Sequence, residues 1–98
     1  SGERLLVTAT KSYFDNTRLL VELEVVNGYR TNVTIQAIRY VTATATVTSA
    51  QMVYGNVNVD LVPGAKYKAL ILVPTNTKAV LIEYRVRDQT LTEAVPLG

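Results

Sequence analysis

Apolar and polar residues alternate along much of this chain, which is the pattern of β-strands with one buried side and one solvent-facing side. The alternation is clean over residues 18–26 and 80–87, and it is recognisable over residues 4–13 and 33–41. In residues 33–41 the apolar set shifts phase after Ala37, which predicts a β-bulge in that strand. No stretch has the period of an amphipathic helix, so the pattern predicts an all-β protein.

The segment formed by residues 61–87 gives the most detailed prediction. Pro63-Gly64 fits the two central positions of a type II turn, because proline presets its φ angle and glycine accepts a positive φ. We therefore predict a hairpin between the strands on either side of this turn. An apolar strand over residues 67–73 follows, and a polar connection over residues 74–78 leads to the next alternating strand.

Together these elements predict an immunoglobulin-like two-sheet sandwich of about seven or eight antiparallel strands, because turn signals recur at the spacing typical of that fold. Residues 3–98 are expected to form this single domain. Hairpins are predicted at residues 15–17, 63–64 and 88–89, and crossings between the sheets at residues 27–31 and 74–78. An open barrel is the alternative architecture.

Residues 41–49 alternate threonine with small apolar residues almost without exception. One interpretation is a flat strand with a threonine ladder facing solvent. The other is an edge strand used for self-association, because the segment has no charge, proline or glycine to block pairing with another chain. Thr42, Thr44 and Thr46 are therefore candidate interaction residues.

Several leucines occupy positions where the alternation calls for polar residues. Leu70, Leu72 and Leu81 are on the nominal outer faces of their strands, and Leu6 and Leu20 are similar cases near the start. Bulges and burial of central strands within one molecule would explain them. The functional alternative is an apolar patch that binds a protein partner or a second copy, with Leu70, Leu72 and Leu81 as its residues.

Composition removes several classes of chemistry. The chain contains no cysteine and no histidine, so disulfides, Cys-ligated metal sites and histidine-activated nucleophiles are excluded. We expect no catalytic residues, no metal and no cofactor. The net charge of +2 is too small to predict binding to nucleic acid, and no apolar run reaches the roughly 18 residues expected of a membrane-spanning helix.

Two acidic groupings have a functional and a structural interpretation. Glu22 and Glu24 place two carboxylates on one strand face, as general acid-base catalysis requires, but a solvated face matched by neighbouring Lys and Arg is the simpler interpretation. Asn56, Asn58 and Asp60 resemble the start of a calcium loop. The glycine and glutamate that such a loop needs are absent from their positions, so the polar face of a strand is preferred.

A basic stripe would form if two basic strands were neighbours; its residues are Lys66, Lys68, Arg85 and Arg87. We expect these strands to lie in opposite sheets, so ordinary solubilising charge is the preferred interpretation. Asn32-Val33-Thr34 is a glycosylation sequon, which has meaning only for an exported protein. Ser1-Gly2 is typical of a cleaved expression tag, so we expect an excised piece of a longer protein whose N-terminus carries a signal or an anchor.

The second half of the chain supports a resemblance through its V-P-G turn, the strand ending in V-P, the V-L-I-E-Y-R-V strand and the closing E-A-V-P-L. Over residues 18–97 these features resemble the small cysteine-free immunoglobulin-like domains of archaeal cell-surface proteins. That group includes the soluble domains of archaellum stator components, the heads of pilins and archaellins, and adhesion-type repeats. No functional residue carries over from it.

The resemblance implies a noncatalytic structural or protein-binding domain in the extracytoplasmic cell envelope, such as an archaellum stator component that contacts the surface layer or its own copies. Homo-oligomers are expected, and contact with a membrane is expected only through an N-terminal anchor. The alternative function is a carbohydrate-binding or accessory domain of a secreted enzyme. Sugar-binding sandwiches usually expose flat aromatic residues, and the absence of tryptophan argues against that alternative.

Overall fold

A computed structural model describes residues 2–98, and the prediction made for Ser1 lies outside them. Within that range the chain forms nine strands and no helix, so the all-β prediction is confirmed. The strands are β1 (Leu5–Tyr13), β2 (Arg18–Asn27), β3 (Val33–Thr42), β4 (Val47–Ser49), β5 (Gln51–Tyr54), β6 (Val59–Leu61), β7 (Lys66–Pro74), β8 (Thr77–Val86) and β9 (Gln89–Pro96).

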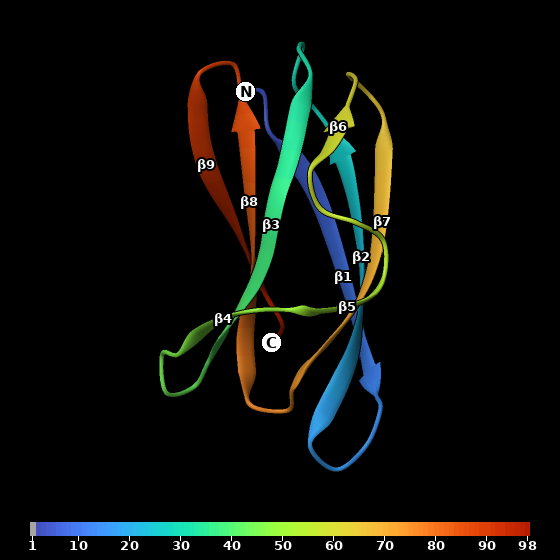
Figure 1. Cartoon of the computed structure of the whole chain (residues 1–98), viewed down its shortest axis with the longest axis vertical. Coiled ribbons are helices and arrows are strands. Elements are labelled where there is room, and N and C mark those ends of the chain that lie inside the picture. Colours follow the sequence, from blue (N-terminus) through green and yellow to red (C-terminus); the bar gives the residue numbers. More distant parts are fainter. Residues whose placement is uncertain (1) are drawn as a thin grey trace.

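The strands build two antiparallel sheets that pack face to face (Figure 1). One sheet has the order β1-β2-β7-β5, and the other has the order β4-β3-β8-β9 with the short β6 also paired to β3. β1, β2, β7 and β5 correspond to the A-B-E-D sheet of the immunoglobulin fold, and β3, β8 and β9 correspond to its C-F-G sheet, with β4 and β6 as additional strands. The predicted crossings at residues 27–31 and 74–78 both connect the two sheets, and the predicted hairpins at residues 15–17 and 88–89 are present.

The core lies between the two sheets and consists of the inward-facing residues that the alternation predicts. Four fully buried residues show the pattern, one from each central strand and therefore two from each sheet: Leu23, Ile71, Ile35 and Ile82. Because β-branched and leucine side chains dominate these positions, burial of apolar surface supplies the main stabilising force.

The predicted hairpin at Pro63-Gly64 is wrong, although the turn itself is correct. The Ala65 N–H donates to the Val62 carbonyl at 2.9 Å, and Gly64 has a φ of 81°, which is the geometry of a type II turn. However, β6 pairs with β3 while β7 pairs with β2 and β5, so the turn connects the two sheets. Turn residues fix the local bend, but they do not decide which strand the next segment pairs with.

The predicted strand over residues 41–49 is interrupted. Thr42 ends β3, and the chain reverses before β4 begins at Val47. The Thr42 N–H donates to the Thr46 carbonyl at 3.1 Å, and Ala45 has a φ of 63°, a left-handed conformation that closes the turn. The alternation of threonine and alanine contains none of the usual turn residues, so the sequence pattern predicted a continuous strand where the chain reverses.

Two further predictions concern strand irregularities. The bulge in β3 is confirmed, because the register against β8 shifts between Ile35 and Ala37. The alternating segment after Gly55 forms a strand only from Val59, since Asn58 has a φ of 62°. The total of nine strands in residues 2–98 exceeds the predicted seven or eight because the chain between β3 and β7 is divided into three short strands.

Thr77 carries a hydroxyl without a partner at the end of the core. It is 8% exposed, and its Oγ1 makes no hydrogen bond. Its cross-strand neighbour Thr42 is equally buried, but the Thr42 hydroxyl pairs with the Thr44 hydroxyl at 3.0 Å. A buried hydroxyl without a partner costs about 1–3 kcal/mol.

We therefore expect Thr77→Val to increase the free energy of unfolding by about 1 kcal/mol, because the orphaned hydroxyl is replaced by a methyl group of similar shape. Urea-induced equilibrium unfolding measures the change. Thr42→Val is the matched control, and it should give no gain because it removes a hydroxyl that is hydrogen-bonded. Equal gains from both substitutions would contradict this account.

Candidate interaction surface

Two of the three predicted leucines lie on the outer face of the β1-β2-β7-β5 sheet. Leu72 lies opposite Leu20 on β2 and Gln51 on β5, and Leu70 lies one step along the same face. Leu72 is only 7% exposed, whereas Leu70 is partly exposed. The neighbouring strands therefore cover Leu72 within the single molecule, and Leu70 remains available at the surface.

The remaining predicted residues lie elsewhere. Leu81 is on the outer face of the other sheet, opposite Arg39 on β3 and Ala94 on β9, so the three leucines do not form one patch. The three threonines lie in and beside the β3–β4 turn, and their hydroxyls bond to one another: Thr42, Thr44 and Thr46.

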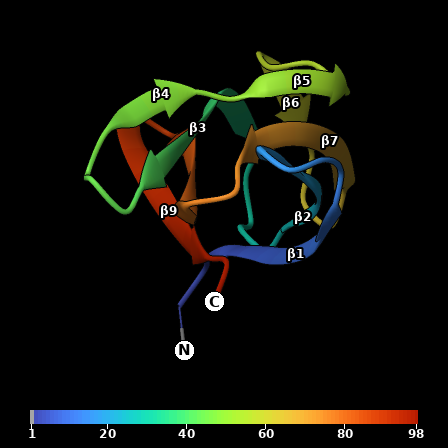
Figure 2. The same cartoon turned by 90° about the horizontal axis from the view of Figure 1, so that it is seen from below.

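One side of the sandwich is formed by an uncharged run of the chain, with Arg18 and Arg39 at its border. Residues 40–59 contain no Asp, Glu, Lys or Arg, and this is the longest such run in the sequence. In the structure these residues include the end of β3, the β3–β4 turn, β4, β5 and the loop before β6. We call this surface the charge-free side. Figure 2 shows β4 and β5 crossing it as one continuous segment, on the opposite side of the sandwich from β1.

The charge-free side exposes large apolar side chains. Val47 is 54% exposed, Val53 is 51% exposed and Tyr54 is 67% exposed. Tyr54 lies opposite Leu70, so the partly exposed leucine adjoins this surface. Recesses of about 300 Å³ and about 280 Å³ lie along the segment and share Ser49 in their walls. Exposed apolar residues beside open recesses are typical of a surface that contacts another protein.

The β4–β5 segment is also an edge of both sheets. β4 pairs only with β3, and β5 pairs only with β7. Ala50, between the two strands, donates its N–H to the Ile38 carbonyl at 3.0 Å and marks the point where the chain passes from one sheet to the other. An uncharged edge strand leaves backbone groups free to pair with another chain.

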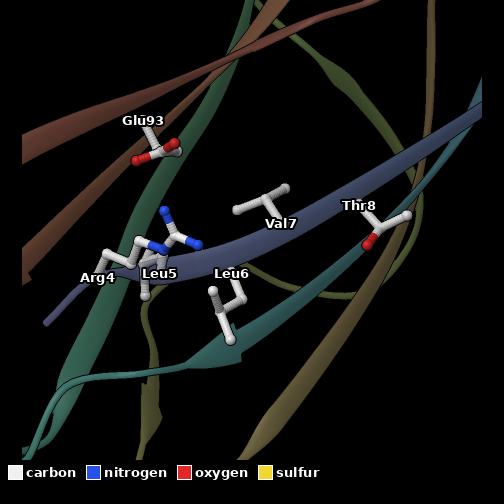
Figure 3. A pocket seen from close by; sticks show the side chains of 6 residues that line it. All are labelled: Arg4, Leu5, Leu6, Val7, Thr8 and Glu93. Carbon is white, nitrogen blue, oxygen red and sulfur yellow. The ribbon is translucent and has the colours of Figure 1, made fainter. Parts of the chain in front are cut away.

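The opposite side of the sandwich, between β1 and β9, is protected. Glu93 lies opposite the buried Ile82, so this carboxylate faces inward from the edge strand β9. A recess of about 310 Å³ is lined by Arg4, Val7 and Glu93, and Figure 3 shows the Arg4 and Glu93 side chains close to each other. An inward-facing charge on an edge strand hinders pairing with another sheet, because that pairing would bury the charge.

The chain matches no known protein-family model, no curated protein and no solved structure.

The acidic and basic groupings of the sequence have ordinary structural surroundings. Glu22 and Glu24 lie on the outer face of β2, and Glu24 lies 3.5 Å from the Lys66 ammonium, so the predicted match with a basic neighbour is present. The basic residues of β7 and β8 lie in opposite sheets, as predicted, so they form no stripe. Asp60 accepts a hydrogen bond from the Thr34 hydroxyl at 2.6 Å.

Two findings concern metals and membranes. Residues 2–98 contain no group of three or more Asp or Glu side chains placed to hold a metal ion. The same range contains no helix long and apolar enough to span a membrane.

The groups with shifted pKa values stabilise turns and the end of the core. The Thr17 backbone N–H and the Arg18 guanidinium beside Asp15 lower the pKa of that carboxyl to about 2. Burial, together with a hydrogen bond to the Tyr29 hydroxyl at 2.8 Å, raises the pKa of Tyr84 above its usual range. Asp15 lies in a turn and Tyr84 in the core, whereas the Tyr67 hydroxyl, whose pKa burial also raises, donates to the Asn56 carbonyl within residues 40–59 at 2.7 Å.

Sequence reasoning identified the correct segment for only part of this surface. The prediction covers residues 41–49, but the uncharged run extends to residue 59 and includes Tyr54, the most exposed apolar residue of this side. The length of the uncharged run, residues 40–59, is the sequence feature from which the full surface could have been predicted. What it could not indicate is that β4 and β5 join different sheets and so form a single side of the molecule.

Proposed function

We propose that this chain is a noncatalytic protein-binding domain of the cell envelope, such as an archaellum stator component that contacts the surface layer or its own copies. The observation that carries the proposal is the charge-free side, where Val47, Val53 and Tyr54 are exposed beside free backbone edges. The placement in the envelope rests on the resemblance of the strand and turn pattern to archaeal surface domains.

The chemistry of the surface favours protein binding over catalysis. Residues 40–59 offer hydroxyl, amide and apolar groups, and the whole chain lacks histidine and cysteine to activate them. Interface cores are depleted of charged residues and enriched in tyrosine, and this side exposes Tyr54. Leu70 adds an apolar contact next to Tyr54.

Site-specific photocrosslinking in intact source cells tests the proposal. A photoreactive amino acid at Tyr54 should crosslink the domain to a surface-layer protein or to another copy of itself, because Tyr54 is 67% exposed on the charge-free side. The same amino acid at Thr90, exposed on β9, is the matched control and should crosslink much less.

Leu70→Lys should weaken the crosslink from Tyr54, because it places a charge beside that residue while the partly exposed position tolerates it. Far-ultraviolet circular dichroism verifies the fold of each variant. Equal crosslinking from Tyr54 and Thr90, or crosslinks confined to cytosolic proteins, would contradict the proposed function.

A further inference from the structure

Hydrogen bonding along β4 determines which of its backbone groups are free. The Thr46 carbonyl accepts the Thr42 N–H at 3.1 Å, and the Ala50 N–H donates to the Ile38 carbonyl at 3.0 Å. Backbone groups of successive residues in a strand point to opposite sides. Residues 46, 48 and 50 therefore direct their backbone groups towards β3.

Val47 and Ser49 consequently direct their N–H and C=O groups away from β3. No strand lies on that side, since β4 is the last strand of its sheet. All three residues of β4 are exposed. These are the groups that a further strand would bind, because an unpaired edge presents a row of donors and acceptors.

We propose that a second copy of this chain pairs with β4 in the antiparallel sense, about a two-fold axis at Thr48. In this arrangement Val47 of one copy exchanges backbone hydrogen bonds with Ser49 of the other, and the reverse pair forms by symmetry. Thr48 lies opposite its own equivalent, where two threonine side chains form a favourable cross-strand pair. The β4-β3-β8-β9 sheet of one copy and the same sheet of the other copy then form one continuous sheet across the dimer.

The absence of charge favours a second copy over a different protein. The residue on a two-fold axis meets its own equivalent, so a charged residue at position 48 would repel itself. Residues 40–59 have no charge, although 18% of the whole chain is charged. A different protein could match a charge at position 48, whereas self-pairing about this position requires an uncharged residue there, as Thr48 is.

Two other edges, β9 and β5, are less suited to this pairing. β9 carries the inward-facing Glu93 and ends at Pro96, which has no N–H to donate. β5 has a register shift between Met52 and Tyr54, which disturbs the spacing of its edge groups. β4 is short, so we expect a dimer that dissociates on dilution.

This inference rests on the role proposed for the charge-free side, and sedimentation velocity over a concentration series of the 98-residue chain tests it. The natural sequence should change from monomer to dimer as concentration rises, and Thr48→Lys should remain monomeric because two ammonium groups would meet at the axis. Thr92→Lys, an exposed position on the outer face of β9, is the matched control and should dimerise as the natural sequence does.

A mixing experiment identifies the axis directly. Thr48→Lys and Thr48→Glu should each be monomeric alone and should form a dimer when mixed, because opposite charges then meet where like charges repelled.

A natural sequence that stays monomeric at high concentration, or a mixture that does not associate, would overturn the proposed dimer. A monomer that still crosslinks from Tyr54 to a surface-layer protein would overturn the dimer alone. A dimer whose Tyr54 crosslinks only to cytosolic proteins would overturn the placement in the cell envelope alone.

Discussion

Replacing Asn27 with alanine should destabilise the domain by about 3 kcal/mol, the largest effect we expect from any single substitution discussed for this protein. Asn27 is 1% exposed at the end of β2. Its Nδ2 donates to the Thr31 and Leu61 carbonyls, both at 2.9 Å, and its Oδ1 accepts the Tyr29 N–H at 2.8 Å.

The backbone of Asn27 extends the same network. Its N–H donates to the Ala65 carbonyl at 3.0 Å, and its carbonyl accepts the Gly64 N–H at 2.8 Å. One buried residue thus holds together the crossing from β2 to β3 and the crossing from β6 to β7. Alanine would leave the side-chain partners without hydrogen bonds in a buried place, where each costs about 1–3 kcal/mol.

Equilibrium unfolding in urea measures the loss. Asn32→Ala is the matched control, because Asn32 lies in the same connection but is exposed, and its effect should stay below about 0.5 kcal/mol. Similar losses for the two substitutions would show that the Asn27 amide does not hold the crossings together.

Gly28→Ala should also destabilise the domain, by about 1–3 kcal/mol, because an added methyl group would overlap the carbonyl oxygen of Arg4. Gly28 does not have a positive φ, so the constraint is the close approach of the chain before β1 and not the backbone conformation. The overlapping atom belongs to the backbone, so no side-chain rotation relieves it.

Hydrogen exchange distinguishes this effect from a general loss of stability. The displaced segment precedes β1, so Gly28→Ala should accelerate amide exchange at the start of β1, around Leu5 and Val7. Gly64→Ala is the comparison: Gly64 has open space around it but a φ of 81°, so alanine there strains only the turn. Unchanged exchange at the start of β1 in Gly28→Ala would contradict the overlap.

Asn27-Gly28 illustrates which features of a connection the sequence predicts and which depend on the tertiary structure. Polar residues continue beyond this dipeptide, so the sequence correctly predicts a crossing between sheets at residues 27–31. That Asn27 is buried and bonded to residues of the β6–β7 region depends on contacts between distant parts of the chain. A turn signal describes neighbours in sequence, and it carries no information on neighbours in space.

For the candidate surface, the leucines also separate what the sequence predicts from what depends on tertiary contacts. Alternation correctly placed Leu70, Leu72 and Leu81 on outer faces, because side-chain direction follows from strand phase. Which of them is covered depends on the strands alongside. Leu72 is enclosed by β2 and β5, Leu70 adjoins the charge-free side, and Leu81 belongs to the other sheet.

By itself the sequence determined the all-β class, the inward and outward phase of the long strands, the bulge in β3 and the type II turn at Pro63-Gly64. These follow from side-chain alternation and local backbone preferences, which act between neighbours in the chain. Only the tertiary structure decided that Pro63-Gly64 connects two sheets, that residues 42–46 form a turn, and that residues 40–59 gather on one side. Those features depend on strand pairing, which is selected by packing of the whole core.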